Sequence, residues 1–189
     1  VSEQDGVLKV RYVEDELLTL PNLPAKKLVV HLPREMAESL TEVSFSSVSA
    51  DFDVDPLTVR EKFAFSSVSG DLETDFITAE GVDAEVSTVS GQISLDGSFR
   101  QVNGESTSGE IDLTLRTCPE KVSLVTVSGK ADVELPRDAG FTLSYDTVSG
   151  DLECDFAAKR NGEKLICGDG GCEISVSTTS GDLKIEVID

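Results

Sequence analysis

A short phrase recurs along the chain and constrains its fold more than any other feature. Each copy centres on a serine that is followed by glycine or alanine, as in Thr-Val-Ser-Gly-Asp-Leu at 147–152. The seven serines lie at intervals of 20, 21, 18, 20, 21 and 31 residues, and they are Ser49, Ser69, Ser90, Ser108, Ser128, Ser149 and Ser180. A period near 20 residues is typical of stacked supersecondary units, because each unit buries its apolar face against the next.

The residues around each serine predict two strands joined by a corner. Positions six and four residues before the serine are mostly apolar, as are positions three and five after it (Phe63 and Phe65, Ile111 and Leu113). Side chains two residues apart share one face of a strand. The residue after the serine is glycine in every copy except the first, which has Ala50. We therefore expect a sharp corner at which a Cβ is disfavoured, least so in the first copy.

These patterns predict an all-β chain, a single-stranded β-helix (solenoid), with about seven to eight rungs of about 20 residues. The alternative is a β-sandwich, which has short strands at similar spacing but does not require like positions to stack.

Residues 1–40 are predicted to form N-terminal strands and a cap, and residues 41–189 the repeats, within one domain. A strand is expected at 27–32 and a short helix at 34–40. The long final interval predicts an insertion at 157–173. It leaves the last rung, 183–187, at the C-terminal edge of the stack, where an unpaired edge needs a cover. The chain is accordingly expected to be a monomer or an end-to-end dimer.

The repeated Val-Ser-Gly-Asp-Leu phrases are joined by an opening Leu-Val-Val-His-Leu-Pro and a closing Gly-Asp-Gly-Gly-Cys-Glu-Ile-Ser-Val-Ser-Thr-Thr-Ser-Gly-Asp-Leu-Lys-Ile. Over about residues 28–189, this set resembles the bacterial putative-adhesin family, a domain of unknown function. The resemblance implies a single-chain, right-handed β-helix, borne on envelope proteins behind an N-terminal membrane anchor, and it supplies no catalytic residues. Because the chain starts at Val1 rather than Met, we expect an extracellular or cell-envelope location behind a removed signal or anchor.

The charge of the chain limits its partners. The chain has 36 acidic and 16 basic residues and a formal net charge of −20. Affinity for nucleic acid comes from Lys and Arg, so nucleic acid is not an expected partner. Cationic partners and hard divalent metal ions are permitted by this charge.

Most of this charge is expected on one face, which we call the acidic wall: the positions two, four and six residues after each serine. Of its 21 positions 16 are acidic and two basic, so the wall carries −14 of the total −20. It either keeps the chain soluble and unstacked or binds divalent cations or a polycationic partner. The candidate residues are Asp51, Asp53, Asp55, Asp71, Glu73, Asp75, Glu110, Asp112, Asp132, Asp151, Glu153 and Asp155. No copy has the spacing of a known Ca²⁺ loop, so Ca²⁺ would bind weakly, and no other cofactor is expected.

The favoured function is a non-enzymatic interaction or structural module at the cell surface, adhesin-like or associated with envelope stress. Its expected partner is an unknown protein, a cationic peptide or a glycan. The alternative is a polysaccharide-active enzyme that uses carboxylates of the wall, for example Asp71 and Asp151. The single histidine, His31, leaves no support for a Ser/His/Asp or Cys/His site.

Four cysteines complete the set of reactive residues. Cys167 and Cys172 flank Gly-Asp-Gly-Gly in the insertion and are candidates for a small disulfide loop, with free thiols as the alternative. Cys154 falls on an inward position and is expected to pack as a small apolar residue. Cys118 lies in a return segment between two predicted strands.

Overall fold

The computed structural model describes residues 2–4, 6–10 and 27–188. The chain divides into two compact units, Val1–His31 and Leu32–Asp189. In the first unit, β1 (Ser2–Gln4) and β2 (Val7–Lys9) form an antiparallel pair. Residues 11–26, which belong to the predicted N-terminal region, lie outside the described residues.

The predicted strand at 27–32 is wrong. This segment has no strand geometry, and its apolar side chains Leu28, Val29 and Val30 are exposed. A strand is stabilised by pairing with a neighbour, and none of the described strands pairs with this segment. The predicted helix is present but short, as α1 (Arg34–Ala37), and no helix in the described part of the chain is long and apolar enough to cross a membrane.

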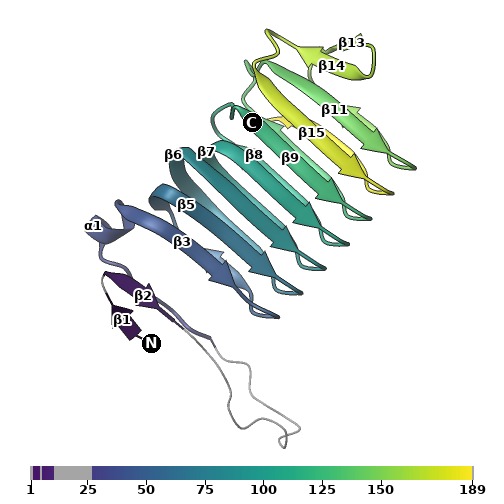
Figure 1. Cartoon of the computed structure of the whole chain (residues 1–189). Helices are drawn as coiled ribbons and strands as arrows, with labels where there is room; N and C mark the ends of the chain where they lie inside the picture. The colour runs from purple at the N-terminus through teal and green to yellow at the C-terminus, as the bar shows by residue number, and fades with distance from the viewer. Residues whose placement is uncertain (1, 5, 11–26, 189) are drawn as a thin grey trace, which may run out of the picture. The chain divides into compact units, whose positions relative to one another are not determined.

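The second unit contains two ladders of parallel strands (Figure 1). In spatial order, the first ladder consists of β3 (Leu40–Ser46), β5 (Leu57–Ser67), the later parts of β6 (Leu72–Thr88) and β7 (Ile93–Ser106), β9 (Lys121–Thr126), β15 (Cys172–Thr178) and β11 (Phe141–Thr147). The second consists of β4 (Phe52–Val54), the first parts of β6 and β7, β8 (Ile111–Leu115), β10 (Ala131–Leu135), β16 (Leu183–Val187) and β12 (Leu152–Cys154). One strand from each ladder, joined at a corner, makes one rung. The all-β, solenoid-like prediction is confirmed, whereas handedness and rung number stay predictions.

The rungs do not stack in chain order. β15 pairs with β9 on one side and with β11 on the other, and β16 lies likewise between β10 and β12. The last repeat of the sequence is therefore inserted between the two repeats that precede it, as Figure 1 shows for β9, β15 and β11. We call β15 and β16 the inserted rung.

The prediction that residues 183–187 lie at the edge of the stack is therefore wrong. β11 and β12 form the last rung instead. The predicted insertion contributes a hairpin, β13 (Lys159–Asn161) and β14 (Lys164–Cys167), and β14 pairs antiparallel with β11. This hairpin covers the edge of the first ladder that β11 would otherwise expose.

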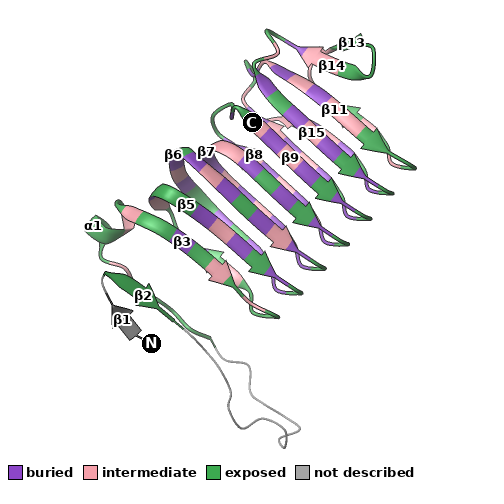
Figure 2. Ribbon diagram, viewed as in Figure 1, coloured by how far each residue is buried: buried purple, intermediate pink, exposed green. Residues whose placement is uncertain are grey.

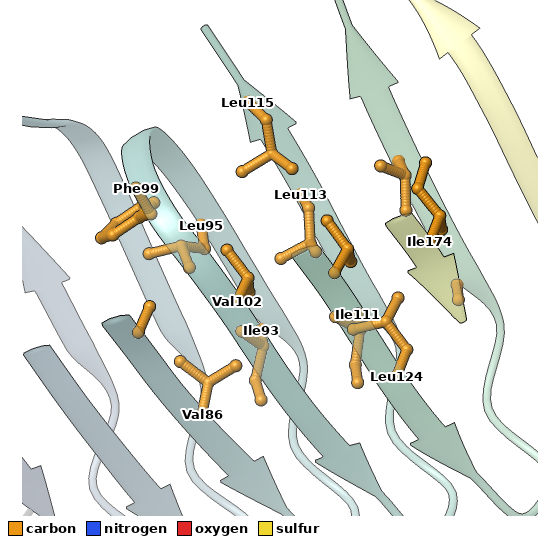
Figure 3. Close-up of a cluster of buried hydrophobic side chains, with 14 of the residues drawn as sticks. Val86, Ile93, Leu95, Phe99, Val102, Ile111, Leu113, Leu115, Leu124 and Ile174 are labelled. Carbon is orange, nitrogen blue, oxygen red and sulfur yellow. The ribbon is translucent and has the colours of Figure 1, made fainter. Parts of the chain in front are cut away.

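The core lies between the two ladders and follows the predicted alternation. Buried and exposed residues alternate along the strands in Figure 2. Side chains from both ladders meet in Figure 3, where Ile111 of β8 lies near Leu124 of β9. Aromatic residues fill the first rungs, and the Phe45 and Phe52 rings, one from each ladder, are 5.0 Å apart. Burial of these columns is the main force that holds the rungs together.

The corner explains the serine/threonine and glycine columns. In the fifth copy, the Gly129 N–H donates to the buried Thr126 hydroxyl at 2.8 Å, and every copy repeats this bond. A Cβ on Gly129 would lie 1.9 Å from the carbonyl oxygen of Gly109 in the rung below, and one on Gly70 2.0 Å from that of Ala50. Ala50 is tolerated because its corner is the first of the stack.

Candidate functional site

The acidic wall forms the outward face of the second ladder. In spatial order, its central row is Asp53, Glu73, Ser94, Asp112, Asp132, Lys184 and Glu153. Neighbours in such a row are about 4.8 Å apart. Asp71 and Asp151 lie in the neighbouring row, formed by the residues two after each serine. They are five strand spacings apart, which is about 24 Å. This is well beyond the separation of about 5–10 Å that a glycosidase carboxylate pair needs, so these two residues do not form an acid pair.

The middle of the wall carries its own cations. Lys130 Nζ bonds to an Asp132 carboxylate oxygen and lies 3.7 Å from Glu110 Oε1. Arg116, from the return segment after β8, donates to Asp96 at 2.8 Å. These bonds raise the pKa of both cations. The carboxylates in this part of the wall are therefore partly neutralised from within.

The inserted rung adds a further cation. If the rungs stacked in chain order, Asp132 would face Glu153 directly, and like charges about 5 Å apart repel by about 1 kcal/mol in water. The inserted β16 places Lys184 between them. Lys184 Nζ binds Glu186 at 2.6 Å, which raises the lysine's pKa, with smaller contributions from Asp132 and Glu153. The rung order therefore separates two of the predicted site residues with a positive charge.

Three of the predicted residues are brought together as a candidate cation site. Glu110, Asp112 and Asp132 each offer a carboxylate oxygen, and these atoms lie within 4.8 Å of one another. Burial raises the pKa of Asp112, against the hydrogen bond from Gln92 Nε2 at 2.7 Å, which lowers it. One oxygen of Asp132 is buried with no hydrogen-bond partner among the described residues. The Lys130 ammonium already supplies a cation to this cluster, so Ca²⁺ would have to compete with it.

The first two rungs of the wall are different, and we call their six acids the β4–β6 patch: Asp51, Asp53, Asp55, Asp71, Glu73 and Asp75. All six are exposed, and in the part of the chain that the structure describes no basic side chain forms an ion pair with any of them. Asp53 and Glu73 are direct partners in the ladder. Backbone N–H groups of Asp71 and Gln92 donate to Asp51 and Asp71 at 3.1 and 2.7 Å. These bonds orient two carboxylates without neutralising the patch.

The opposite end of the wall is intermediate in character. Asp151, Glu153 and Asp155 are exposed on and beside the edge strand β12. Asp182 of the inserted rung accepts the backbone N–H of Asp151 at 2.9 Å. Lys184 stands next to Glu153 in the ladder, so this end has a cation that the β4–β6 patch lacks.

Of the two alternatives for the cysteines of the insertion, the structure has free thiols, as it has for all four cysteines. Cys167 of β14 and Cys172 of β15 are both register partners of Phe141, on opposite sides of β11. Two strand spacings separate their Cα atoms by about 10 Å, beyond the limit of about 7 Å for a disulfide. The Cys167–Cys172 bridge is therefore not compatible with this register.

The corners also expose an apolar ridge that the sequence analysis missed. The residue before the central serine is valine in five copies, and all five are at least 45% exposed: Val48, Val68, Val89, Val127 and Val148. The available signal was an apolar residue between two polar ones at a sharp corner. Nothing in the described residues covers this ridge.

Comparisons with known proteins address the family and not the activity. None of the curated proteins compared matches the sequence. Among solved structures, the crystal structure of a putative cell adhesion protein from Clostridium sporogenes is similar, with a TM-score of 0.47 and 9% identity, over 80% of this chain and 94% of that one. The family model of the Toastrack DUF4097 domain matches residues 37–186, which include all seven corner phrases. The chain therefore belongs to the Toastrack DUF4097 family.

Proposed function

We propose that this protein is a non-enzymatic interaction module that works at a cell surface and binds a cationic segment of a partner protein through the β4–β6 patch. The observation that carries the proposal is the contrast within the wall. Six exposed carboxylates of the patch have no basic partner among the described residues, whereas the lysines and the arginine on and beside the rest of the wall are ion-paired. An external cation therefore gains most at the patch.

The spacing of the patch suits an extended basic peptide. Acidic side chains recur at every second residue of each strand, at about 6.8 Å, and across strands at about 4.8 Å. An extended peptide with Lys or Arg at alternate positions has the same repeat of about 6.8 Å on one face. Each exposed pair contributes about 0.2–1 kcal/mol, so binding needs several pairs and weakens with salt.

The distribution of the carboxylates favours binding over catalysis. The acids recur evenly along an open sheet face, whereas an acid/base pair requires two carboxyl groups held around one bond. The cell-surface location rests on the resemblance of the repeat phrases to envelope-borne domains. A cell-surface location is consistent with an exposed docking face, but the docking face is inferred independently of that location.

Isothermal titration calorimetry with a synthetic peptide of alternating Lys and Ser tests the proposal at low salt. The double variant Asp53→Asn/Glu73→Gln should weaken binding by about 2- to 30-fold, the loss of two exposed pairs. The matched control, Glu42→Gln/Glu105→Gln, removes the same charge from exposed residues of the first ladder and should have a much smaller effect. Equal weakening by both variants would show that only net charge matters and would overturn the proposal.

Ca²⁺ is the competing occupant of the wall. A ligand that binds only the folded state raises the melting temperature by mass action. We expect millimolar Ca²⁺ to raise it no more than NaCl of equal ionic strength. A Ca²⁺-specific rise that Asp53→Asn/Glu73→Gln abolishes would make the patch a metal site instead of a peptide-binding site.

A further inference from the structure

Two thiols far apart in the sequence meet where the inserted rung begins. Cys118 lies in the return segment between β8 and β9 and is exposed, and Cys172 is the first residue of β15 and is buried. The backbone N–H of Cys172 donates to the Gly140 carbonyl oxygen at 2.9 Å, and Cys118 Sγ lies 3.7 Å from the same oxygen. Cys118 Sγ and the Cys172 N–H therefore contact the same carbonyl oxygen, which puts the two cysteines side by side.

Backbone bonds on both sides hold this arrangement. The Glu173 N–H donates to the Glu120 carbonyl at 3.0 Å, and Glu173 is the register partner of Lys121. Cys172 is also the register partner of Phe141 in β11. The segment that carries Cys118 is thus tied to β15 directly beyond Cys172, and this tie holds the two cysteines beside each other.

We propose that Cys118 and Cys172 are a thiol modification site that forms an intramolecular disulfide and locks the inserted rung into the stack. The oxidant is a low-molecular-weight disulfide of the glutathione class. The Cys118 thiolate attacks one of its sulfur atoms, forming a mixed disulfide and releasing one thiolate. The Cys172 thiolate then attacks Cys118 Sγ and releases the second. Two cysteine thiols are oxidised, one small disulfide is reduced to two thiols, and the two protons pass to the released thiolates.

The environments of the sulfur atoms set the order of the two steps. The neighbouring Cys172 thiol lowers the pKa of Cys118 to about 7, against burial, which raises it. Cys118 is therefore the more acidic and more accessible nucleophile. The neighbouring Cys118 thiol and burial raise the pKa of Cys172. Cys172 becomes the resolving thiol once Cys118 is in a mixed disulfide, because that step removes the neighbouring thiolate.

The consequence of the bond follows from the topology. The inserted rung contains the last strands of the chain, and it pairs with strands on both sides. A bond from Cys172 to the return segment before β9 ties that rung to an earlier one and closes a long loop. Closing a loop of this length should raise the melting temperature by on the order of 10 °C.

The test is oxidation of the folded protein with glutathione disulfide, followed by thiol titration, peptide mapping by mass spectrometry and thermal unfolding. We expect two thiols to be lost, a Cys118–Cys172 linked peptide and a melting temperature raised by on the order of 10 °C. The variant Cys154→Ser/Cys167→Ser should behave in the same way. Cys118→Ser should form no internal bond and show no rise.

Two results would overturn the proposal. One is a linked peptide that joins Cys167 to Cys172. The other is a glutathione adduct that persists on Cys118 while Cys172 stays reduced. Mapping of the unmodified sequence alone distinguishes these outcomes, so the proposal does not depend on the folding of any variant.

Discussion

The replacement of Gly129 by alanine tests the stacking of the corners directly. The added Cβ would lie 1.9 Å from the Gly109 carbonyl oxygen and 2.9 Å from its carbon, both backbone atoms of the neighbouring rung. Ordinary contacts of a Cβ begin near 3.4 Å, so the two rungs must separate locally by about 1 Å or more. No rotamer change relieves this clash, because neither partner is the end of a side chain.

The cost can be worked out from the bonds that such a separation breaks. Near the corner, two hydrogen bonds join these two rungs. Ser128 N donates to Thr107 O at 3.0 Å, and Ile111 N donates to Lys130 O at 3.0 Å. Two bonds at about 0.5–1.5 kcal/mol each predict that Gly129→Ala lowers the free energy of unfolding by about 1–3 kcal/mol.

Urea unfolding followed by far-UV circular dichroism measures this change, as a lower midpoint at an unchanged slope. The matched control is Ala50→Gly, in the first corner of the stack. It removes a methyl group without a clash and should cost no more than about 1 kcal/mol, from backbone entropy. If Gly129→Ala stays within about 0.5 kcal/mol of the unmodified protein, the close stacking of the corner column is wrong.

Three further predictions concern the inserted rung and the wall. Tyr145→Phe removes a 2.7 Å hydrogen bond from the Tyr145 hydroxyl to the Gly181 carbonyl and should lower the free energy of unfolding by about 0.5–1.5 kcal/mol in urea; no measurable loss would contradict it. Burial raises the folded-state pKa of Asp112, so its ionised form destabilises the fold at pH 7, and this cost disappears as the pH falls through the raised pKa towards the ordinary value. Asp112→Asn should therefore raise the free energy of unfolding at pH 7 by no more than about 1 kcal/mol, because solvent screens this half-exposed group. The substitution should have no effect near pH 3. Thermal unfolding at both pH values measures the change, and an equal gain at both would refute the raised pKa of Asp112. Deletion of residues 172–189 exposes the edges of β9 and β11 to each other and to solvent and should give an aggregating chain in size-exclusion chromatography; a monomeric chain that unfolds cooperatively would contradict the rung order.

The sequence correctly predicts which side chains of each rung point into the core, because the alternation of side chains along a strand is a local property. Phe63, Ile111 and Leu183 fall on inward columns and are buried. The corner chemistry is also visible, since glycine follows the serine wherever a rung lies below. Ala50 departs from that column for a reason that the structure supplies.

The order of the rungs could not be predicted, because every copy carries the same residues at its corner. Gly150 and Gly181 make equivalent contacts with the rung below, to Gly181 and Gly129 respectively. The distinguishing signals are single residues. Tyr145 reaches the inserted rung with its hydroxyl, and Lys184 breaks the acidic row. Neither departs from its column strongly enough to indicate the position of the last repeat.

The candidate site was predicted as a list of acids but not as a pattern of paired and unpaired ones. Arg116 lies in a return segment, outside the columns, yet it neutralises Asp96. Cys118 of a return segment and Cys172 of the inserted rung also lie against one carbonyl oxygen, that of Gly140. Both depend on how return segments fold against the ladders, and the periodicity of the strands does not specify that.

Cysteine cross-linking at the exposed corner serines tests the inserted rung most directly, in a background where the four native cysteines are replaced by serine. Ser128 and Ser180 occupy neighbouring rungs, as do Ser180 and Ser149, because Ser180 N donates to Val127 O at 3.0 Å and Ser149 N to Thr179 O at 3.2 Å. Their Cα atoms are about 5 Å apart, within the range for a disulfide, whereas Ser128 and Ser149 are about 10 Å apart. We predict rapid oxidation of the Ser128→Cys/Ser180→Cys and Ser149→Cys/Ser180→Cys pairs and none of Ser128→Cys/Ser149→Cys. A cross-link between positions 128 and 149, with none between 128 and 180, would show that the rungs stack in chain order and would contradict the positions of Lys184 and Cys172 described above.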